Sequence, residues 1–208
     1  MFHAHNVTTF SCGSTLTINH TNGTVAPETK TVNYGTVTTS LSGASKCWIT
    51  QNLGADNQAG GAGDNTNAAA GWYWKFNRMQ GYKVGPTPAW VFAGINENSN
   101  WLAANDPCTT ELGTGWRIPT YTELFNADAN GPWANYTDAY NSVLKFHAAG
   151  FLNNTNGVLT SRGTNGYYWS STQFNNGNGW CLAFFSTGSD MSSANGKNYG
   201  FSLRCIKD

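Results

Sequence analysis

The residues best suited to molecular recognition lie near the C-terminal end of this chain, between positions 173 and 199. This segment, which we call the cassette, combines Asn, Ser, Gly and Asp with a few aromatic residues. Binding surfaces that adapt to a partner have this composition, because aromatic rings supply contact area and small polar groups supply adaptable hydrogen bonds. No catalytic motif has this make-up. The cassette therefore predicts ligand binding without a covalent step.

The residues that could hold a metal or attack a substrate are scattered. Five cysteines form no CxxC pair and have no His at ligand spacing, which argues against a zinc site. The odd number allows two disulfides and one free thiol, and we expect Cys181 to be free because it lies inside the cassette. Five buried thiols in a reducing compartment are the alternative. The cysteines are Cys12, Cys47, Cys108, Cys181 and Cys205.

A polar loop at residues 55–67 offers carboxylate and amide oxygens, the ligands that Ca²⁺ prefers. Its Gly and Asn residues are also typical of a solvated loop, which is the interpretation that we favour. We therefore expect no cofactor and no bound metal, with a structural calcium ion at this loop as the alternative.

The composition argues against several partners. The 208 residues carry no net charge and only 11% are charged, so we expect neither nucleic acid nor a membrane surface as a partner. No apolar run is long enough for membrane insertion. Residues 1–5 lack the basic end and the apolar stretch of a signal peptide, and we interpret them as a cloned or processed start.

An α+β fold, with two helices beside a twisted antiparallel sheet, is predicted to position the cassette. One helix is expected at residues 68–78, where Trp72 and Phe76 lie near helical spacing. The other should run from Tyr121 to about residue 127, because Thr120 and Glu123 have the spacing of a capping box. Strands rich in β-branched and aromatic residues are expected at 15–18, 29–32, 36–38, 46–50, 144–152, 158–159, 167–172, 180–185 and 201–206.

Four ordered motifs resemble the FISUMP and related families of C-type-lectin-like fold. The motifs are residues 46–55, the Gly-Trp-Arg-Ile-Pro-Thr-x-x-Glu run at 115–123, residues 168–172 and residues 200–205. The resemblance covers about residues 28–208, so residues 1–27 are expected to be an N-terminal extension with short strands. The chain is most similar to the variable proteins of diversity-generating retroelements. In those proteins, template-directed mutagenesis at adenines rewrites codons of a C-terminal cassette while the scaffold is retained.

The resemblance implies a variable binding face on a fixed scaffold. It also implies that Cys108 and Cys205 lie close together, and we expect Cys12 and Cys47 to form a second pair. The expected scaffold residues, with Arg117 and Glu123 as a buried ion pair, are Trp116, Arg117, Pro119, Thr120, Glu123, Trp169, Trp180 and Arg204. The expected ligand-binding residues are Phe174, Asn175, Asn176, Gly177, Asn178, Cys181, Ala183, Phe185, Ser189, Asp190, Ser192, Ser193, Asn195, Gly196, Asn198 and Tyr199.

The genetic code offers a check on this resemblance. Changing only the adenines of an Asn codon gives Phe, Ser, Tyr, Cys, Gly and several other residues, but never Trp, Gln, Lys, Glu or Met. Every expected binding residue belongs to the reachable set or is Asn itself. The unreachable cassette residues, which we expect to be fixed, are Gln173, Trp180, Met191 and Lys197.

Alternation along residues 180–185 predicts which side chains face solvent, because successive strand residues point to opposite faces. One face carries Cys181, Ala183 and Phe185, which we expect to be exposed. The other carries Trp180, Leu182 and Phe184, which we expect to pack into the core.

We expect a non-catalytic adhesin-like protein, displayed on a cell surface, a pilus or a phage tail, with a protein or glycan on a target surface as its partner. A structural subunit without its own ligand is the first alternative. The second is an enzyme similar to the formylglycine-generating enzymes, which share an Arg-Leu-Pro-Thr-x-x-Glu motif. Those enzymes need nearby cysteines, whereas Cys181 and Cys205 lie on separate predicted strands. True calcium-dependent lectins use paired ligands beside a Pro, and this sequence lacks that pattern.

Overall fold

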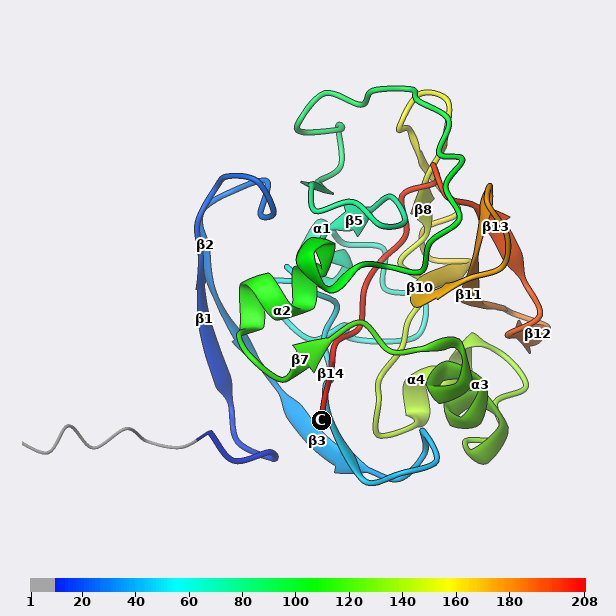
Figure 1. Ribbon diagram of the computed structural model, residues 1–208. Helices are drawn as coiled ribbons and strands as arrows, with labels where there is room; N and C mark the ends of the chain where they lie inside the picture. The colour runs from blue at the N-terminus through cyan, green and yellow to red at the C-terminus, as the bar shows by residue number, and fades with distance from the viewer. Residues whose placement is uncertain (1–9) are drawn as a thin grey trace, which may run out of the picture.

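Short antiparallel strands joined by long irregular segments make up most of the computed structural model, which describes residues 10–208 (Figure 1). Four α-helices accompany these strands within the described residues, so the predicted α+β class is confirmed. None of the helices within this part of the chain is long and apolar enough to cross a membrane. The interpretation of the first five residues falls outside the described part.

A four-stranded sheet joins distant parts of the chain in the order β3-β4-β14-β7. Ile206 of the last strand pairs with Trp48 on one side and with Arg117 on the other. The C-terminal end of the chain is thereby held between two earlier segments. The strands are β3 (Thr36–Thr39), β4 (Lys46–Ile49), β14 (Ile206–Lys207) and β7 (Trp116–Arg117).

Both expected disulfides are present, and they reinforce the same sheet. Cys12 is bonded to Cys47 in β4, and Cys108 is bonded to Cys205 just before β14. The second bridge closes a loop with a sequence separation of 97 residues. Loops of this length give a bridge about 4–5 kcal/mol of stabilisation in the chain-entropy description. Cys181 is the free thiol, and it is buried.

The second four-stranded sheet contains the cassette. Its strands are β10 (Gly166–Gln173), β11 (Asn178–Phe185), β12 (Gly188–Asp190) and β13 (Ala194–Gly196). β11 pairs with β10 along one edge, and with both β12 and β13 along the other. This sheet lies on the opposite side of the molecule from the hairpin of β1 (Leu16–His20) and β2 (Lys30–Tyr34) (Figure 1).

The expected helix at residues 68–78 is wrong beyond its first turn. Helix α1 covers only Asn67–Ala70, and the chain then extends into β5 (Tyr73–Trp74), which pairs with β6 (Gly81–Tyr82). Gly71 ends the helix with φ of +70°, at a point where a Cβ atom would lie 2.5 Å from the Leu53 carbonyl oxygen. Only glycine fits this close approach.

The second expected helix is confirmed and is longer than predicted. Helix α3 covers Tyr121–Asn130 and begins with the capping box of Thr120 and Glu123. Two further helices were not predicted, namely α2 (Pro107–Leu112) and α4 (Tyr136–Asn141). Each has a side-chain cap, from Asp106 and from Asn135. The Asp106-Pro107 pair is a helix-start signal that the sequence does contain.

The expected strand at residues 144–152 is also wrong. Only β8 (Phe151–Leu152) forms, paired with β9 (Leu159–Thr160). Lys145 has φ of +54°, and the carbonyls of residues 144 and 145 accept hydrogen bonds from Arg204 instead of from a strand. The expected strand at 201–206 is broken as well, because Phe201 and Ser202 form only isolated bridges and Ile206 alone belongs to a strand, β14.

Arg204 is a buried scaffold residue, as expected. Its guanidinium also donates to the Asn52 side-chain oxygen at 2.8 Å and lies 4.6 Å from the ring centroid of Phe146. Trp169 is also fully buried, with its indole nitrogen donating to the Trp74 carbonyl at 2.8 Å. Trp169 belongs to β10 and packs against Phe76 and Phe201, so it forms part of the base of the cassette sheet.

Candidate ligand-binding surface

The antiparallel register places selected cassette residues on one face of the second sheet. Tyr167 in β10, Ala183 in β11 and Asp190 in β12 pair side by side, so their side chains point to the same face. Aromatic rings from several elements collect on this face. We call it the aromatic face, and it comprises Phe151, Tyr167, Phe185, Tyr199 and Phe201.

A pocket of about 220 Å³ opens in the aromatic face. Phe151 and Tyr167 meet edge to face with ring centroids 5.1 Å apart, and Tyr199 stacks beside Phe201 at 5.8 Å. Asn195 of β13 supplies an amide to the same pocket. The cassette thus contributes Asn195 and Tyr199, while the scaffold contributes the other three rings.

Cys181 lies beneath this face, and its thiol is expected to be unreactive. Burial raises the pKa of its thiol to about 12, although hydrogen bonds with Asn195 and Ser193 act in the opposite direction. The Asn195 amide nitrogen lies 3.2 Å from the sulfur. A thiol with so high a pKa is protonated at neutral pH and is a poor nucleophile. Burial also raises the pKa of Tyr167, so its ring, like the Cys181 thiol, carries no charge.

The turn at residues 174–178 lies at the other face of the sheet. Phe174 is 51% exposed and rests on Trp180, with ring centroids 4.7 Å apart. Trp180 in turn contacts Tyr121 at the start of α3, at 4.8 Å. The Asn175 side chain accepts hydrogen bonds from the backbone of Gly177 and Asn178, so it shapes the turn.

The expected ligand-binding residues are exposed to different degrees. Four are exposed, namely Phe174, Asn175, Asn176 and Ser192. Ten are half-buried, namely Gly177, Asn178, Phe185, Ser189, Asp190, Ser193, Asn195, Gly196, Asn198 and Tyr199. The remaining two, Cys181 and Ala183, are buried, which contradicts their expected exposure.

The alternation along β11 is correct, but both of its faces are covered. Cys181 packs with Trp169 and Phe201, and Ala183 lies between the larger side chains of Tyr167 and Asp190. Leu182 and Phe184 occupy the core on the other face, as predicted. Trp180 lies on the same face but is only half-buried. At its end of the strand it packs against Tyr121, which is itself half-buried, and not against core residues. The expectation that Trp180 is a core residue is therefore wrong.

The cassette residues that adenine changes cannot produce have structural contacts. Lys197 is fully buried, and its ammonium donates to the Glu97 carbonyl at 2.7 Å and to the Gln173 side chain at 3.0 Å. Gln173 also donates to Asn98 at 2.6 Å. Met191 is buried in the core beneath β11. These contacts fix residues 97–99 against the cassette.

Ser189 was expected to bind ligand, yet it is tied to the scaffold. Its hydroxyl lies 2.5 Å from an Asp128 carboxylate oxygen and 2.6 Å from the Trp133 carbonyl. Asp128 lies in α3, so Ser189 connects β12 to this helix. Substitution at this position would disturb that connection before it changed a binding surface.

Arg117 and Glu123 form the expected ion pair, but both are half-buried rather than buried. The two guanidinium nitrogens each lie 2.7 Å from a Glu123 oxygen, and Asp208 binds the same guanidinium at 2.8 Å. Burial would raise the pKa of Glu123, but the hydrogen bonds from Arg117 and Thr120 lower it overall. Trp116 and Pro119 flank this pair in the same segment, with Trp116 in the core.

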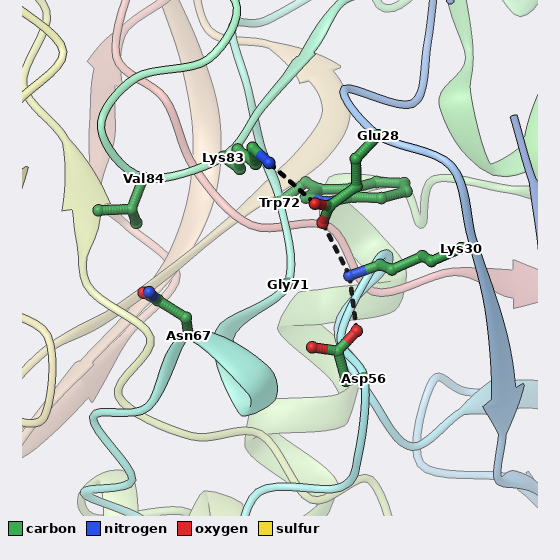
Figure 2. Close-up of a pocket in the computed structure, with 8 residues that line it drawn as sticks. All are labelled: Glu28, Lys30, Asp56, Asn67, Gly71, Trp72, Lys83 and Val84. Carbon is green, nitrogen blue, oxygen red and sulfur yellow. Dashed lines mark hydrogen bonds and ion pairs between the residues drawn. The ribbon is translucent and has the colours of Figure 1, made fainter. Parts of the chain in front are cut away.

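A different pocket, of about 280 Å³, lies beside the N-terminal hairpin (Figure 2). Glu28 lines it and lies between Lys83 at 2.9 Å and Lys30 at 3.2 Å, and it accepts a hydrogen bond from the Trp72 indole. Lys30 also contacts Asp56 at 2.8 Å. Two lysines and two carboxylates thus neutralise one another, and we call this group the ion-pair pocket.

The ion-pair pocket has a structural explanation. Although burial acts to raise the pKa of Glu28, hydrogen bonds from Lys83, Trp72 and Lys30 lower it to about 2, so the carboxylate stays charged. The pairs connect β2 to the loops that follow β4 and β6 (Figure 2). All four charged groups are satisfied by the protein itself.

The polar loop at residues 55–67 is organised by its own backbone. Asp64 accepts hydrogen bonds from Gly60 at 2.8 Å and from Thr66 at 2.9 Å. Burial opposes but does not outweigh these bonds, and the pKa of Asp64 is lowered. Within residues 10–208, no group of three or more His, Cys, Asp or Glu side chains is arranged to hold a metal ion.

Three aromatic residues of the pocket, Phe151, Tyr167 and Phe201, were not among the expected site residues. Tyr167 could have been found from the alternation of side chains along β10. It lies on the same face of that strand as Trp169, and Trp169 pairs with Cys181, which was an expected site residue. Phe151 and Phe201 reach the site through long-range packing that no local pattern encodes.

Comparisons with known proteins provide one match. Residues 129–206 match the family model described as a domain of unknown function, DUF8237. The matched segment contains the whole cassette and all five residues of the aromatic face. The search of curated proteins and the search of solved structures each returned no match.

Proposed function

We propose that this protein binds a ligand through the aromatic face without chemical change, and that its cassette alters the specificity of binding. The observation that carries this proposal is the pocket of about 220 Å³, in which scaffold rings surround two residues of the cassette. Rings that are only half-buried retain apolar area that a partner can cover. Clusters of this kind are frequent at the centres of binding interfaces.

The uncharged lining limits the ligand. The hydroxyls of Tyr167 and Tyr199 and the amide of Asn195 can form hydrogen bonds, but they offer no counter-charge to a strongly ionic group. The pocket volume suits one ring or one side chain. We therefore infer that a ring inserted from a larger molecule, such as a sugar ring of a glycan or an aromatic side chain of a protein, is the recognised group.

We further propose a C-type-lectin-like scaffold of the kind found in variable proteins of diversity-generating retroelements. The pairing of β14 with both β4 and β7, and the capped helix after β7, support this assignment. Two disulfides are compatible with a protein exported to a cell surface, a pilus or a phage tail. The enzyme alternative lacks support, because Cys205 is bonded to Cys108 and the Cys181 thiol is protonated.

A binding screen tests the proposal. The protein would be applied to glycan arrays and to displayed surface proteins, and each positive ligand would be titrated against a Tyr199→Ala variant. Thr187→Ala is the matched control, because Thr187 is an exposed cassette residue outside the aromatic face. We expect Tyr199→Ala to weaken binding by about 2 kcal/mol and the control to bind as the wild type does. Equal binding by all three proteins would place the ligand elsewhere.

A further inference from the structure

A third pocket, of about 380 Å³, separates the segment after β5 from the irregular loop at residues 91–95. Apolar groups form much of its lining, including Met79, Val91 and Ile95. Val91 is 63% exposed, which leaves an apolar opening to solvent. No residue of this pocket belongs to the aromatic face.

A buried cation lines this apolar pocket. Lys75 is only 6% exposed, and its ammonium donates one hydrogen bond to the Val91 carbonyl. The ammonium also lies 4.1 Å from the Trp90 ring centroid and 5.6 Å from that of Tyr82. Within residues 10–208, no carboxylate forms an ion pair with it, and residues 1–9 contain neither Asp nor Glu.

Other lysines and arginines nearby have more partners. Lys197 also lacks a carboxylate, but its ammonium donates to the Glu97 carbonyl at 2.7 Å and to the Gln173 side chain at 3.0 Å. Arg78 lines the same pocket but is paired with Glu97 at 3.0 Å. Lys30 and Lys83 are paired with Glu28 in the ion-pair pocket (Figure 2). Burial and the neighbouring Arg78 lower the pKa of Lys75, in keeping with a cation that lacks a counter-charge. Buried charges are normally paired, because desolvation without a partner is costly.

We propose that this pocket binds a small amphipathic carboxylate, whose charged group pairs with Lys75 and whose apolar part contacts Met79, Val91 and Ile95. The carboxylate supplies the missing counter-charge and accepts the unused ammonium hydrogens. The apolar part covers surface that the protein leaves open. This site is separate from the aromatic face and does not depend on the function proposed there.

The methionines provide a direct test. Of the two methionines within residues 10–208, Met79 lines this pocket, whereas Met191 lies in the core beneath β11. With methionine methyl groups labelled with ¹³C, the full chain would be titrated with n-octanoate, n-octanol and acetate. We expect octanoate to shift the Met79 signal in a saturable way without moving Met191. Octanol should bind about ten-fold more weakly, because it cannot pair with the ammonium.

Variants at two lysines complete the test. Lys75→Met should remove the preference for octanoate over octanol, Lys75→Arg should keep it, and Lys83→Met is the matched control that should also keep it. Should Lys75→Met fail to fold, the wild-type comparison of octanoate with octanol decides alone. The proposal is overturned if Met79 does not respond, if octanol binds as tightly as octanoate, or if a folded Lys75→Met variant keeps the preference. Acetate binding as tightly as octanoate would indicate an unspecific anion and would also overturn it.

Discussion

The aromatic face and the ion-pair pocket are both concave, yet they differ in how their polar groups are satisfied. In the ion-pair pocket, Glu28 has two lysines and an indole nitrogen as partners, and Asp56 has Lys30. In the aromatic face, the rings of Tyr167 and Tyr199 are half-buried, and the residues that line the pocket between them carry no ionisable acid or base. A hollow whose groups already bind one another stabilises the fold, whereas a hollow with uncovered rings is available to a ligand.

The largest expected effect concerns the base of the aromatic face. Trp169 is fully buried and stacks on Phe201 with ring centroids 4.3 Å apart, so Trp169→Ala should lower the free energy of unfolding by about 3–5 kcal/mol. Trp180 is half-buried, and Trp180→Ala should cost only about 1–2 kcal/mol. Denaturant unfolding of both variants measures this. Equal losses would mean that Trp180 belongs to the core after all.

The next effect separates the two faces of the cassette sheet. Phe185→Ala should weaken ligand binding by about 2 kcal/mol, because its ring adjoins Tyr167 on the aromatic face at 6.0 Å. Phe174→Ala should change affinity little, since Phe174 rests on Trp180 at the other face. Titration calorimetry with a ligand from the screen gives both values. A larger loss for Phe174→Ala would move the binding site to the turn at 174–178.

A pH titration probes the ion-pair pocket. The pKa of Glu28 is about 2 in the folded chain against an ordinary value of 4.5. A carboxyl with a lowered pKa contributes stability that is fully present above the unfolded value and is lost as pH falls through the folded value. Stability should therefore fall between pH 4.5 and 2 in the wild type, and less steeply in Glu28→Gln. Identical pH profiles would show that these pairs do not stabilise the fold.

The smallest expected effect is the difference between the ion-pair pocket and the aromatic face in their response to added salt. Added NaCl screens partly exposed charges, so the pairs of Glu28 should lose at most about 1 kcal/mol of stabilisation. Binding in the pocket of the aromatic face, which no charged side chain lines, should stay nearly constant over the same range. We would measure affinity and melting temperature from about 0.05 to 0.5 M NaCl. A steep loss of affinity with salt would indicate an ionic ligand and would contradict the proposed contact.

Local signals predicted the parts of the fold that depend on neighbouring residues. The capping box of Thr120 and Glu123 and the alternation along β11 are properties of short segments, and both are present. The helix at 68–78 could not be judged locally, because Gly71 approaches the backbone of Leu53. The absence of a strand at residues 144–150 could not be judged locally either. Arg204, which is distant in sequence, donates hydrogen bonds to the backbone carbonyls of residues 144 and 145.

The candidate site was predictable in its segment but not in its details. The composition of the cassette indicated the region, and Asn195 and Tyr199 line the pocket as expected residues. The burial of Cys181 and Ala183 results from side chains on adjacent strands, which alternation within one strand does not describe. The contacts of Ser189 could not be predicted for the same reason, since its partners lie in and after α3.

The most direct test of the central claim is the DNA sequence around the gene. We predict a near-identical repeat of the segment that encodes residues 174–199, differing from it only at adenines of the repeat. The differences should fall at codons of the aromatic face and its surroundings, such as 185, 190, 195 and 199, and should spare codons 180, 191 and 197. Differences spread over all four bases, or the absence of any repeat, would contradict diversification of this surface.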